Sequence, residues 1–495
     1  MSMSIPYPMA KSPNILIFLT DQQRADTIGA LGSASIRTPV LDRLVSEGTT
    51  FTRAYTPSPV CVPARCALAT GQLPARSQCW DNLDMADTIS YMEVLREAGY
   101  RTHGVGKMHF TPDHEKMWGY QTRDISEEGK PGDFPDFLRA QGFGHVLANN
   151  GLRGEYYYTP QPSQLPAHLH ESHWVADRCI DFLTGRDPNK PFLLDCHFIK
   201  PHPPFENPMP WSFLYRPNEM PHPFQPVPAA DVLTRVNRLQ NRYKYKDRAA
   251  SDDLAWRTMK AAYYAAISFV DYQIGRVLEA LGDEIDNTLV LFSSDHGEML
   301  GDYGCAGKRC MLEASARIPL IARWPGHFTA GQKIDTAVSL IDIFPTLTAA
   351  AGTQSAAPPE RPGTSLIDIA NGAHQGREVS SQFQANWMGH YMVTDGQTKF
   401  VHSAPDHRSW TFQVEDDLKD TPLDIAGPTA LESVALADGN WKSHDVPPWP
   451  DDLDYGLLRQ DPDGIEAMLE TIRPYYQGSS QSADDGLKAI TDHMP

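Results

Sequence analysis

The chain has 495 residues, more than a single hydrophobic core usually serves, so we expect one large domain and a smaller second one. Its hydrophobic fraction of 41% and charged fraction of 21% are typical of a globular protein and exclude a largely disordered chain. The net charge of −19 argues against nucleic acid or an anionic membrane as a partner, because either would need a broad basic surface.

Buried strands and amphipathic helices alternate over residues 14–292. Residues 14–20 form a continuous apolar run typical of a strand buried on both faces. The Thr38-Pro39 pair then opens a helix that Gly48 closes. The same alternation predicts helices over 92–98, 174–183 and 254–281 and strands over 101–106, 192–199 and 289–292. This order is typical of an α/β fold with a mostly parallel sheet.

Polar residues follow these strands directly, at the point where each strand ends. They are Asp21, Lys107, His202 and Asp295. In an open parallel sheet, ligands bind beyond the carboxyl ends of the strands. We therefore expect these four side chains to belong to one site.

Two proline-rich stretches interrupt the alternation. The stretch at 201–228 begins at a candidate site residue and is too long for a simple connection, so we interpret it as a substrate-facing loop. The stretch at 356–362 is interpreted as a domain junction.

Short strands replace the α/β pattern beyond that junction. Residues 391–394, 399–402 and 410–414 predict a meander with a turn at Asp395-Gly396, and a late helix is expected over 465–472. We therefore predict a catalytic α/β domain over 1–375 and a C-terminal subdomain, with a small antiparallel sheet and a helix, over 376–495.

Cysteine usage and the first residues indicate the compartment. The seven cysteines are odd in number and lack metal-site spacing, which favours buried thiols over disulfides or a zinc site. The chain starts without a signal-peptide pattern and contains no run of about 18 apolar residues. We expect a cytoplasmic protein with no membrane partner.

Cys61-Val62-Pro63-Ala64-Arg65 carries the strongest chemical signal. We expect Pro63 at the first position of a helix that Gly71 ends, which places Cys61 at the helix N-terminus. The exposed N–H groups and the helix dipole there favour an anion, and Arg65 adds a fixed positive charge. The alternative is a buried cysteine near a capping turn.

Two polar pairs, Asp21-Gln22 and Asp295-His296, are candidate metal ligands. Three oxygen donors and one imidazole suit Ca²⁺ or Mn²⁺ better than structural zinc. The alternative for either pair alone is a cap or a surface turn.

Further candidate groups are a lysine and a histidine in Gly106-Lys107-Met108-His109, His202 between prolines, and Lys308 in a glycine-bearing loop. Lys107 and His109 would face the same side of an extended segment. A lone histidine or lysine is more often a surface group, but each of these follows a strand end or the metal candidates.

Taken together, these motifs resemble those of the type I sulfatases. Cys61-Val62-Pro63-Ala64-Arg65 and the helix ending in Thr70-Gly71 resemble the CxPxR signature of that family. The resemblance runs from about residue 14 to about residue 352, and its supporting blocks are Asp21-Gln22-Gln23-Arg24-Ala25-Asp26, Gly106-Lys107-Met108-His109 and Ser294-Asp295-His296-Gly297-Glu298 leading to Lys308.

The resemblance implies the alkaline-phosphatase-like fold. That fold has a large mixed, mostly parallel sheet flanked by helices and a smaller C-terminal α+β domain with an antiparallel sheet. It also implies an arylsulfatase-type hydrolase of small-molecule sulfate monoesters. Cys61 would be converted to formylglycine by a formylglycine-generating enzyme, and the aldehyde hydrate would be the nucleophile.

Site roles follow from the same resemblance. One divalent metal ion, with Ca²⁺ favoured and Mn²⁺ as the alternative, would be held by Asp21, Gln22, modified Cys61, Asp295 and His296. Arg65 and Lys107 would position the nucleophile, and His109 would be the base. His202 and Lys308 would bind the sulfate and assist the leaving oxygen.

This sequence departs from the family pattern at two ligands. Many sulfatases have an aspartate where Gln22 stands and an asparagine where His296 stands, which leaves Mn²⁺ open. The same residues resemble the related phosphonate monoester and phosphodiester hydrolases, which is the rival function. Those relatives lack the Gly-Lys-x-His block, so Lys107 and His109 favour sulfate. A remote alternative is a non-enzymatic metal- or anion-binding protein.

Substrate identity is not encoded in these motifs. We expect the loops 113–154 and 201–248 to shape the pocket. Their aromatic residues, which could stack on a substrate ring or serve packing, are Trp118, Trp211, Phe213 and Tyr215. We also expect a homo-oligomer, with a dimer contact after Pro448.

Overall fold

The structure is a computed structural model of the whole chain. It describes residues 12–422 apart from positions 83, 86, 154–155, 226, 235, 238–251, 355–360, 386–388 and 415–419. The predicted helix over 465–472 and the predicted dimer contact after Pro448 lie outside the described residues, and so does most of the junction at 356–362.

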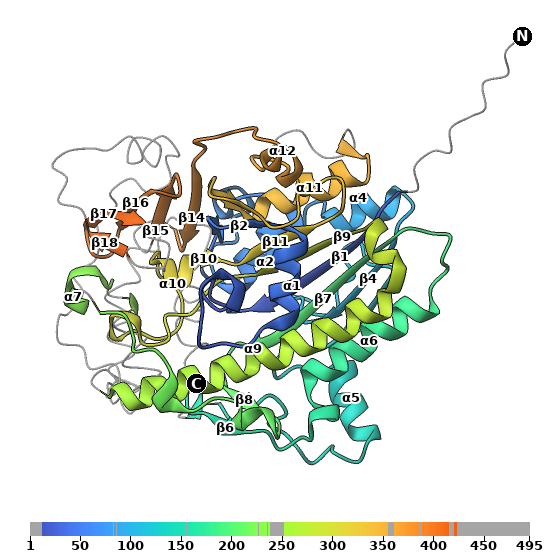
Figure 1. Ribbon diagram of the computed structural model, residues 1–495, viewed down its shortest axis with the longest axis horizontal. Helices are drawn as coiled ribbons and strands as arrows, with labels where there is room; N and C mark the ends of the chain where they lie inside the picture. The colour runs from blue at the N-terminus through green and yellow to red at the C-terminus, as the bar shows by residue number, and fades with distance from the viewer. Residues whose placement is uncertain are drawn as a thin grey trace, which may run out of the picture.

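A mixed sheet forms the centre of the large domain (Figure 1). Within the described residues it has eight strands in the order β12-β2-β11-β9-β1-β7-β4-β5. Five neighbouring strands are parallel: β9 (Thr288–Ser294), β1 (Asn14–Asp21), β7 (Phe192–Pro201), β4 (Arg101–Gly106) and β5 (Thr122–Ile125). At the other edge, β11 (Leu320–Arg323) runs antiparallel to β9 and to β2 (Thr49–Phe51), and β12 (Gln332–Ile334) is parallel to β2.

Alternate residues of β1 belong to different layers of the core. Ile15, Ile17 and Leu19 pack in the cluster that includes the helices α2 (Cys61–Thr70), α4 (Tyr91–Glu97) and α11 (Ile343–Ala350). Leu16 and Phe18 pack with α1 (Pro39–Glu47), α6 (Glu171–Gly185) and α9 (Asp253–Leu281) on the other face (Figure 1). Because helices cover both faces of the sheet, every residue of β1 is buried.

Shorter elements connect these layers. The helices are α3 (Pro74–Ser77), α5 (Asp133–Ala140), α7 (Ala229–Val232), α10 (Glu313–Ala316) and α12 (Leu366–Ala370). The short strands are β3 (Ala54–Tyr55), β6 (Gln161–Pro162), β8 (Glu206–Asn207), β10 (Arg317–Ile318) and β13 (Val338–Ser339). The 3-10 helices are η1 (Gly29–Leu31), η3 (Ala167–Leu169), η4 (Trp211–Phe213), η5 (Pro217–Glu219), η6 (Gly282–Asn287), η7 (Asp302–Gly304) and η8 (Leu340–Asp342).

The C-terminal part contains an antiparallel meander, at the left of Figure 1. Its strands are β14 (Val379–Phe383), β15 (His390–Thr394), β16 (Thr398–Ser403), β17 (Arg408–Val414) and β18 (Asp420–Pro422). This sheet and the parallel sheet confirm the predicted fold class. The three predicted meander strands and the turn at Asp395-Gly396 are present. The domain boundary at 375/376 stays a prediction.

The start of α2 differs from the prediction. Cys61 is itself the first helical residue and Val60 is the N-cap, so Pro63 is the third residue and not the first. The Ala64 N–H donates to the Val60 carbonyl at 3.1 Å. The first helical turn therefore starts at Cys61, two residues before Pro63. A proline is tolerated there because the first N–H groups of a helix have no partner within the helix.

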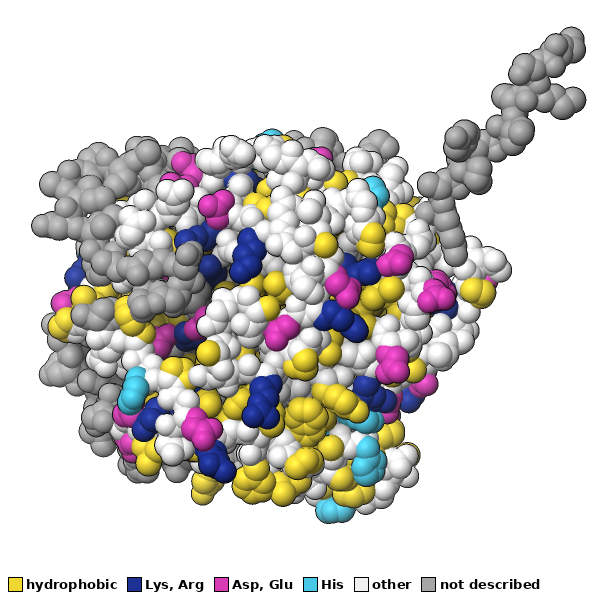
Figure 2. Space-filling view, viewed as in Figure 1, with side chains coloured by type: hydrophobic (Ala, Val, Ile, Leu, Met, Phe, Trp, Pro, Cys, Tyr) yellow, Lys and Arg dark blue, Asp and Glu magenta, His cyan; other side chains and the backbone are white. Residues whose placement is uncertain are grey.

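The surface mixes charges of both signs. On the face shown in Figure 2, basic and acidic side chains are interspersed among apolar and other polar atoms. Among the described helices, none is both long and apolar enough to cross a lipid bilayer.

Candidate active site

Four neighbouring parallel strands bring the predicted strand-end residues to one edge of the sheet. Strands β1 and β9 run in register, with Thr20 opposite Ser294, so Asp21 and Asp295 emerge side by side. On the other side of β1, Gly106 of β4 lies opposite His197 of β7. Lys107 and His202 follow these two strands, and the sheet topology therefore gathers side chains that are far apart in sequence.

Cys61 lies at the centre of this cluster of polar side chains. Its Sγ is 2.8 Å from Lys308 Nζ, 3.2 Å from His296 Nε2 and 3.6 Å from Asp21 Oδ1, and the residue is only 2% exposed. Burial raises the pKa of the Cys61 thiol, but the nearby charges of Lys308, Lys107 and His296 outweigh it and hold the pKa well below the usual value. The site thus favours an anion at this position.

Arg65 holds the carboxylates of Asp21 and Asp295 in place. It is one helical turn after Cys61 and is buried. Its Nε donates to Asp295 Oδ2 at 2.9 Å, its Nη2 donates to Asp21 Oδ2 at 3.2 Å, and its Nη1 donates to the Lys107 carbonyl. A planar guanidinium that bridges two carboxylates and a backbone carbonyl holds all three in place.

Lys107 and Glu128 form a second charged layer. Lys107 Nζ lies 2.7 Å from Asp21 Oδ2 and 2.6 Å from Glu128 Oε2. Burial lowers the pKa of Lys107, but Asp21 and Glu128 outweigh it and raise that pKa well above its ordinary value. Burial and the charge of Cys61 raise the pKa of Asp21, but Lys107, His202 and Lys308 lower it to about 2.

Glu128 is a site residue that sequence reasoning missed. Besides Lys107 it contacts His202 Nδ1 at 3.1 Å and Arg153 Nη2 at 2.6 Å. It follows β5, so the strand-end rule applied to this strand would have found it. However, β5 is short and half-buried, and its residues show no apolar run that would predict a strand before Glu128.

His109 reaches the site by a route that the sequence did not predict. Its φ is 56°, so the segment is not extended there as we expected. The buried carboxylate of Glu127 accepts the N–H groups of both Met108 and His109, at 2.9 and 2.8 Å, and turns the chain. The imidazole is still near enough to the Cys61 thiol to contribute to the lowered pKa of that thiol.

The acidic and imidazole ligands match a divalent cation. One ligand atom each from Asp21, Cys61, Asp295 and His296 lies within 4.8 Å of the others, and all four residues are buried. Gln22 adds a buried Oε1 that has no hydrogen-bond partner. An orphaned buried oxygen is costly unless something else binds it. These residues therefore fit a cation whose ligands are mainly oxygen.

The aromatic residues of the predicted pocket loops pack against the protein. Trp118 is buried and makes an edge contact with Phe110 at 5.1 Å between ring centroids. Trp211 lies against Phe269 of α9, and the Tyr215 hydroxyl bonds Ser268 of the same helix. Phe213 alone of the four is strongly exposed. Trp118, Trp211 and Tyr215 therefore serve packing, which was the alternative to stacking on a substrate ring.

Tyr157 is an aromatic residue that does meet the site. Its hydroxyl lies 3.4 Å from His202 Nε2, and the Arg153 guanidinium lies 5.4 Å from its ring centroid. Tyr157 and Arg153 thus border the His202 side of the cluster.

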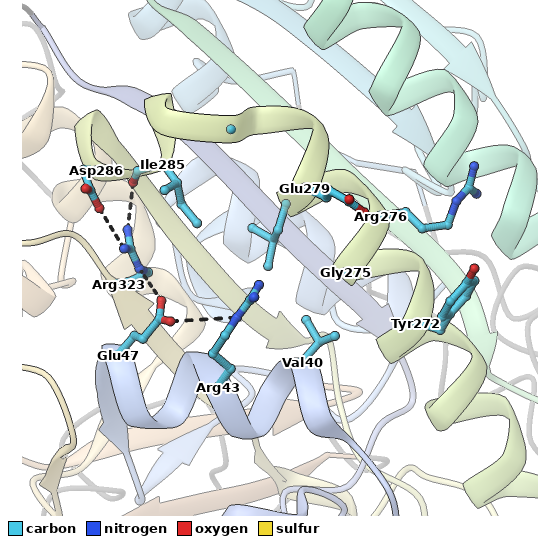
Figure 3. Close-up of a pocket in the computed structure, with 12 residues that line it drawn as sticks. Val40, Arg43, Glu47, Tyr272, Gly275, Arg276, Glu279, Ile285, Asp286 and Arg323 are labelled. Atoms are coloured by element: carbon cyan, nitrogen blue, oxygen red, sulfur yellow. Dashed lines mark hydrogen bonds and ion pairs between the residues drawn. The ribbon is translucent and has the colours of Figure 1, made fainter.

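A separate groove of 750 Å³ lies between α1 and α9 (Figure 3). Four of its charged side chains pair with one another: Arg323 contacts Glu47 at 3.0 Å and Asp286 at 2.8 Å, and Arg43 contacts Glu47 at 3.8 Å. None of the candidate catalytic or metal residues lines it.

Comparisons with known proteins agree with this fold and these motifs. The sulfatase family model matches residues 13–353, and a model for the C-terminal part of N-sulphoglucosamine sulphohydrolase matches residues 301–427. An arylsulfatase from Clostridium perfringens is 31% identical over 448 residues, which cover 82% of this chain and 89% of the relative. A choline-sulfatase from Rhizobium meliloti is 28% identical, with 88% of each chain covered.

A solved structure shows the same fold. The phosphonate monoester hydrolase of Agrobacterium radiobacter superposes with a TM-score of 0.72 at 23% sequence identity, covering 93% of this chain and 95% of that one. Fold and site together define a hydrolase of the alkaline phosphatase superfamily. Within that superfamily the chain belongs to the sulfatase family. Its reaction class is sulfuric ester hydrolysis.

Proposed function

We propose that this enzyme hydrolyses small sulfate monoesters in the manner of the arylsulfatases, through a formylglycine hydrate derived from Cys61. The observation that carries the proposal is the setting of Cys61: a buried thiol at a helix N-terminus, 2.8 Å from Lys308 and beside His296 and Asp21. A thiol that only fills space in the core does not need charged neighbours. An oxygen nucleophile that attacks an anionic ester does need nearby cations.

The chemistry needs a residue with two oxygens on one carbon. One hydroxyl of the hydrate attacks sulfur, the bond from sulfur to the ester oxygen breaks, and the alcohol leaves with a proton. The second hydroxyl then gives up its proton, the bond from carbon to the sulfate oxygen breaks, and sulfate leaves. The aldehyde that remains is hydrated again by water.

The surrounding residues supply the charges and protons for these two steps. Lys308 and His202 bind the sulfate and stabilise or protonate the leaving oxygen. Arg65 and Lys107 hold the nucleophile and its aspartate neighbours in place, as their contacts with Asp21 indicate. His109, which contributes to the lowered pKa of the Cys61 thiol, takes the proton of the second hydroxyl.

A divalent metal ion completes the proposed site. Asp21, Gln22, residue 61, Asp295 and His296 would hold it, and the ion would polarise a sulfate oxygen and favour the ionised nucleophile. We propose Ca²⁺, with Mn²⁺ as the alternative because one ligand is an imidazole. Elemental analysis of the purified protein distinguishes the two.

Replacing Cys61 with serine tests the proposal. Cys61→Ser should release one equivalent of phenol from an aryl sulfate and then stop, because a serine sulfate ester has no second hydroxyl to expel the sulfate. Stopped-flow absorbance gives the burst, and mass spectrometry should find the sulfated peptide. Cys66→Ser, at another buried thiol on the same helix, should keep turning over. Sustained turnover by Cys61→Ser would refute the scheme.

A second candidate function is hydrolysis of phosphonate monoesters or phosphodiesters on the same scaffold. A multifunctional protein of the alkaline phosphatase superfamily from Trinickia caryophylli is 31% identical over 380 residues, and Gln22 and His296 resemble the metal ligands of the phosphonate and phosphodiester hydrolases. Turnover of an aryl sulfate and an aryl phosphonate by one preparation separates the two. An unmodified Cys61 in protein from the native host would favour the remote alternative, a non-enzymatic binding protein.

The remaining partners are part of the same proposal. A formylglycine-generating enzyme would convert Cys61 during maturation, and its action is tested by the mass of the peptide around residue 61. Homo-oligomerisation and a cytoplasmic location stay predictions.

A further inference from the structure

Glu298 is a fully buried carboxylate that lies behind the candidate metal ligands. Its Oε1 accepts the N–H of Leu300 at 3.0 Å and the N–H of Gly307. Its Oε2 accepts the side-chain amide of Gln22 and the hydroxyl of Tyr158, the latter at 3.2 Å. All four partners are donors, so only a group that accepts on both oxygens satisfies them.

This arrangement fixes which end of the Gln22 amide is free. The Gln22 Nε2 is used by Glu298, whereas Oε1 is buried and has no hydrogen-bond partner. The main chain of Gln22 is also held: its N–H donates to Asp295 Oδ1 at 3.0 Å, and its carbonyl accepts the Tyr263 hydroxyl at 2.6 Å. With the backbone fixed, the choice left to the side chain is which of its two ends meets Glu298.

We propose that Glu298 is a positioning residue that turns the Gln22 carboxamide so that its oxygen, and not its nitrogen, faces the metal ion. The inference rests on the proposed function, because it takes Gln22 as a ligand. An amide oxygen carries lone pairs that bind a hard cation, but an amide NH₂ presents two hydrogens to it. Residues behind metal ligands commonly orient them in this way.

The residue pair Gln22 and Glu298 also explains how a neutral ligand replaces the aspartate that many sulfatases carry. A carboxylate at position 22 has two equivalent oxygens and needs no partner to choose between them. A carboxamide does need one, and Glu298 supplies it: the N–H groups of Leu300 and Gly307 hold Oε1, which leaves Oε2 to accept the amide of Gln22.

Glu298→Gln is the direct test. Its amide oxygen stays with the Leu300 and Gly307 N–H groups, so its NH₂ faces position 22. Gln22 then turns its own oxygen toward that NH₂ and presents nitrogen to the ion. We expect the affinity for Ca²⁺ or Mn²⁺ to fall about 10- to 100-fold. Isothermal titration of the metal-stripped protein with each cation measures it without reference to turnover.

A double substitution distinguishes orientation from general damage. In Gln22→Glu with Glu298→Gln, the new carboxylate accepts the new amide and keeps one oxygen for the ion, so the affinity should return at least to that of the parent. Tyr158→Phe removes a different donor from the same Oε2 and should change the affinity less than about threefold. Thermal unfolding of each variant checks that it is folded.

The outcomes separate this inference from the function beneath it. If the parent binds the ion and Glu298→Gln binds it equally well, or if the folded double variant is no better than Glu298→Gln, the inference is wrong and the proposed function is unaffected. If the parent binds neither cation, the proposed metal site is wrong and the inference fails with it. A loss of cation affinity in Glu298→Gln, together with its recovery in the double variant, supports the inference.

Discussion

Gln22 and His109 show how individual residues at the site are held in uncommon conformations. Both have positive φ angles, of 67° and 56°, which are uncommon for residues other than glycine and concentrate at functional sites. In each case a buried carboxylate accepts the backbone N–H: Asp295 at 3.0 Å for Gln22 and Glu127 at 2.8 Å for His109. Acidic residues here therefore stabilise the backbone as well as carrying charge.

Glu171 leads to a prediction on pH dependence. It is fully buried, and burial raises its pKa to about 8 against the attraction of Lys200 and a hydrogen bond from the Ser172 hydroxyl. Its ordinary pKa is 4.5, so between pH 4.5 and 8 the folded protein binds a proton that the unfolded chain releases. Stability therefore falls as pH rises through this window, by about 1.4 kcal/mol per pH unit.

Glu171→Gln should remove that fall. We expect urea unfolding at pH 5 to give nearly the same free energy for both proteins, and at pH 8 a clearly larger one for the variant. Glu279→Gln makes the same change at an exposed position of α9 and should track the parent at both pH values. Parallel pH profiles for Glu171→Gln and the parent would contradict the argument.

At the scale of elements, the close approach of β4 and β7 places Lys107. Gly106 ends β4 with a φ of 91°, and a Cβ there would lie 1.9 Å from the carbonyl oxygen of His197 on β7. The next N–H, that of Lys107, donates to the same carbonyl at 3.2 Å. The absence of a side chain at position 106 is therefore what lets the lysine leave the sheet at this point.

Gly106→Ala should both destabilise the protein and impair turnover. Gly99 is the matched control, because its φ of 90° is nearly the same but a Cβ there meets nothing within 4 Å. Gly99→Ala carries only the left-handed strain, about 1 kcal/mol, and should leave kcat unchanged. Gly106→Ala should cost at least about 2 kcal/mol more and lower kcat, measured by denaturant unfolding and aryl sulfate turnover. Equal losses would show that the close approach has no influence.

At the scale of the whole molecule, a buried ionic cluster connects the C-terminal sheet to the large domain. Lys399 of β16 contacts Glu313 of α10 at 3.0 Å and also Asp420 of β18, and all three residues are fully buried. The Glu313 N–H donates to Asp420 Oδ2 at 2.8 Å, which closes the network. Burial raises the pKa of Asp420 to about 6 even though Lys399 lowers it.

Lys399→Met should weaken the association of the two parts. It leaves the buried carboxylate of Asp420 without Lys399 and leaves Glu313 with Arg317 at 3.5 Å, and loss of one partner of a buried pair costs about 3–5 kcal/mol. Lys333→Met, at an exposed position of β12, should change stability by less than about 0.5 kcal/mol. Denaturant unfolding of both variants measures the difference. A loss for Lys399→Met no larger than that of the control would show that the cluster does not stabilise the fold.

Much of the candidate site was accessible from the sequence because its residues follow recognisable strands. Asp21, Lys107, His202 and Asp295 each come after a strand that the sequence predicts, and the structure brings them together. Glu128 was missed because the short, half-buried β5 was not predicted as a strand, and the role of Glu298 was missed because it depends on contacts with Gln22 and Tyr158. Pro63 was misplaced in α2 because its sequence preference does not show where the first turn closes.

The sequence by itself determined the order of strands and helices, the sulfatase motifs and the residues with the needed chemistry, because hydrophobic periodicity and motif spacing are local properties. Only the tertiary structure decided which carboxylate meets which cation. Lys107 meets Asp21 because β4 and β1 end at one edge of the sheet, and helix α2 and the loop before α10 bring Arg65 and Lys308 to Asp21 and Cys61. The orientation of the Gln22 amide was likewise decided by Glu298, since residues 276 positions apart meet only in the folded chain.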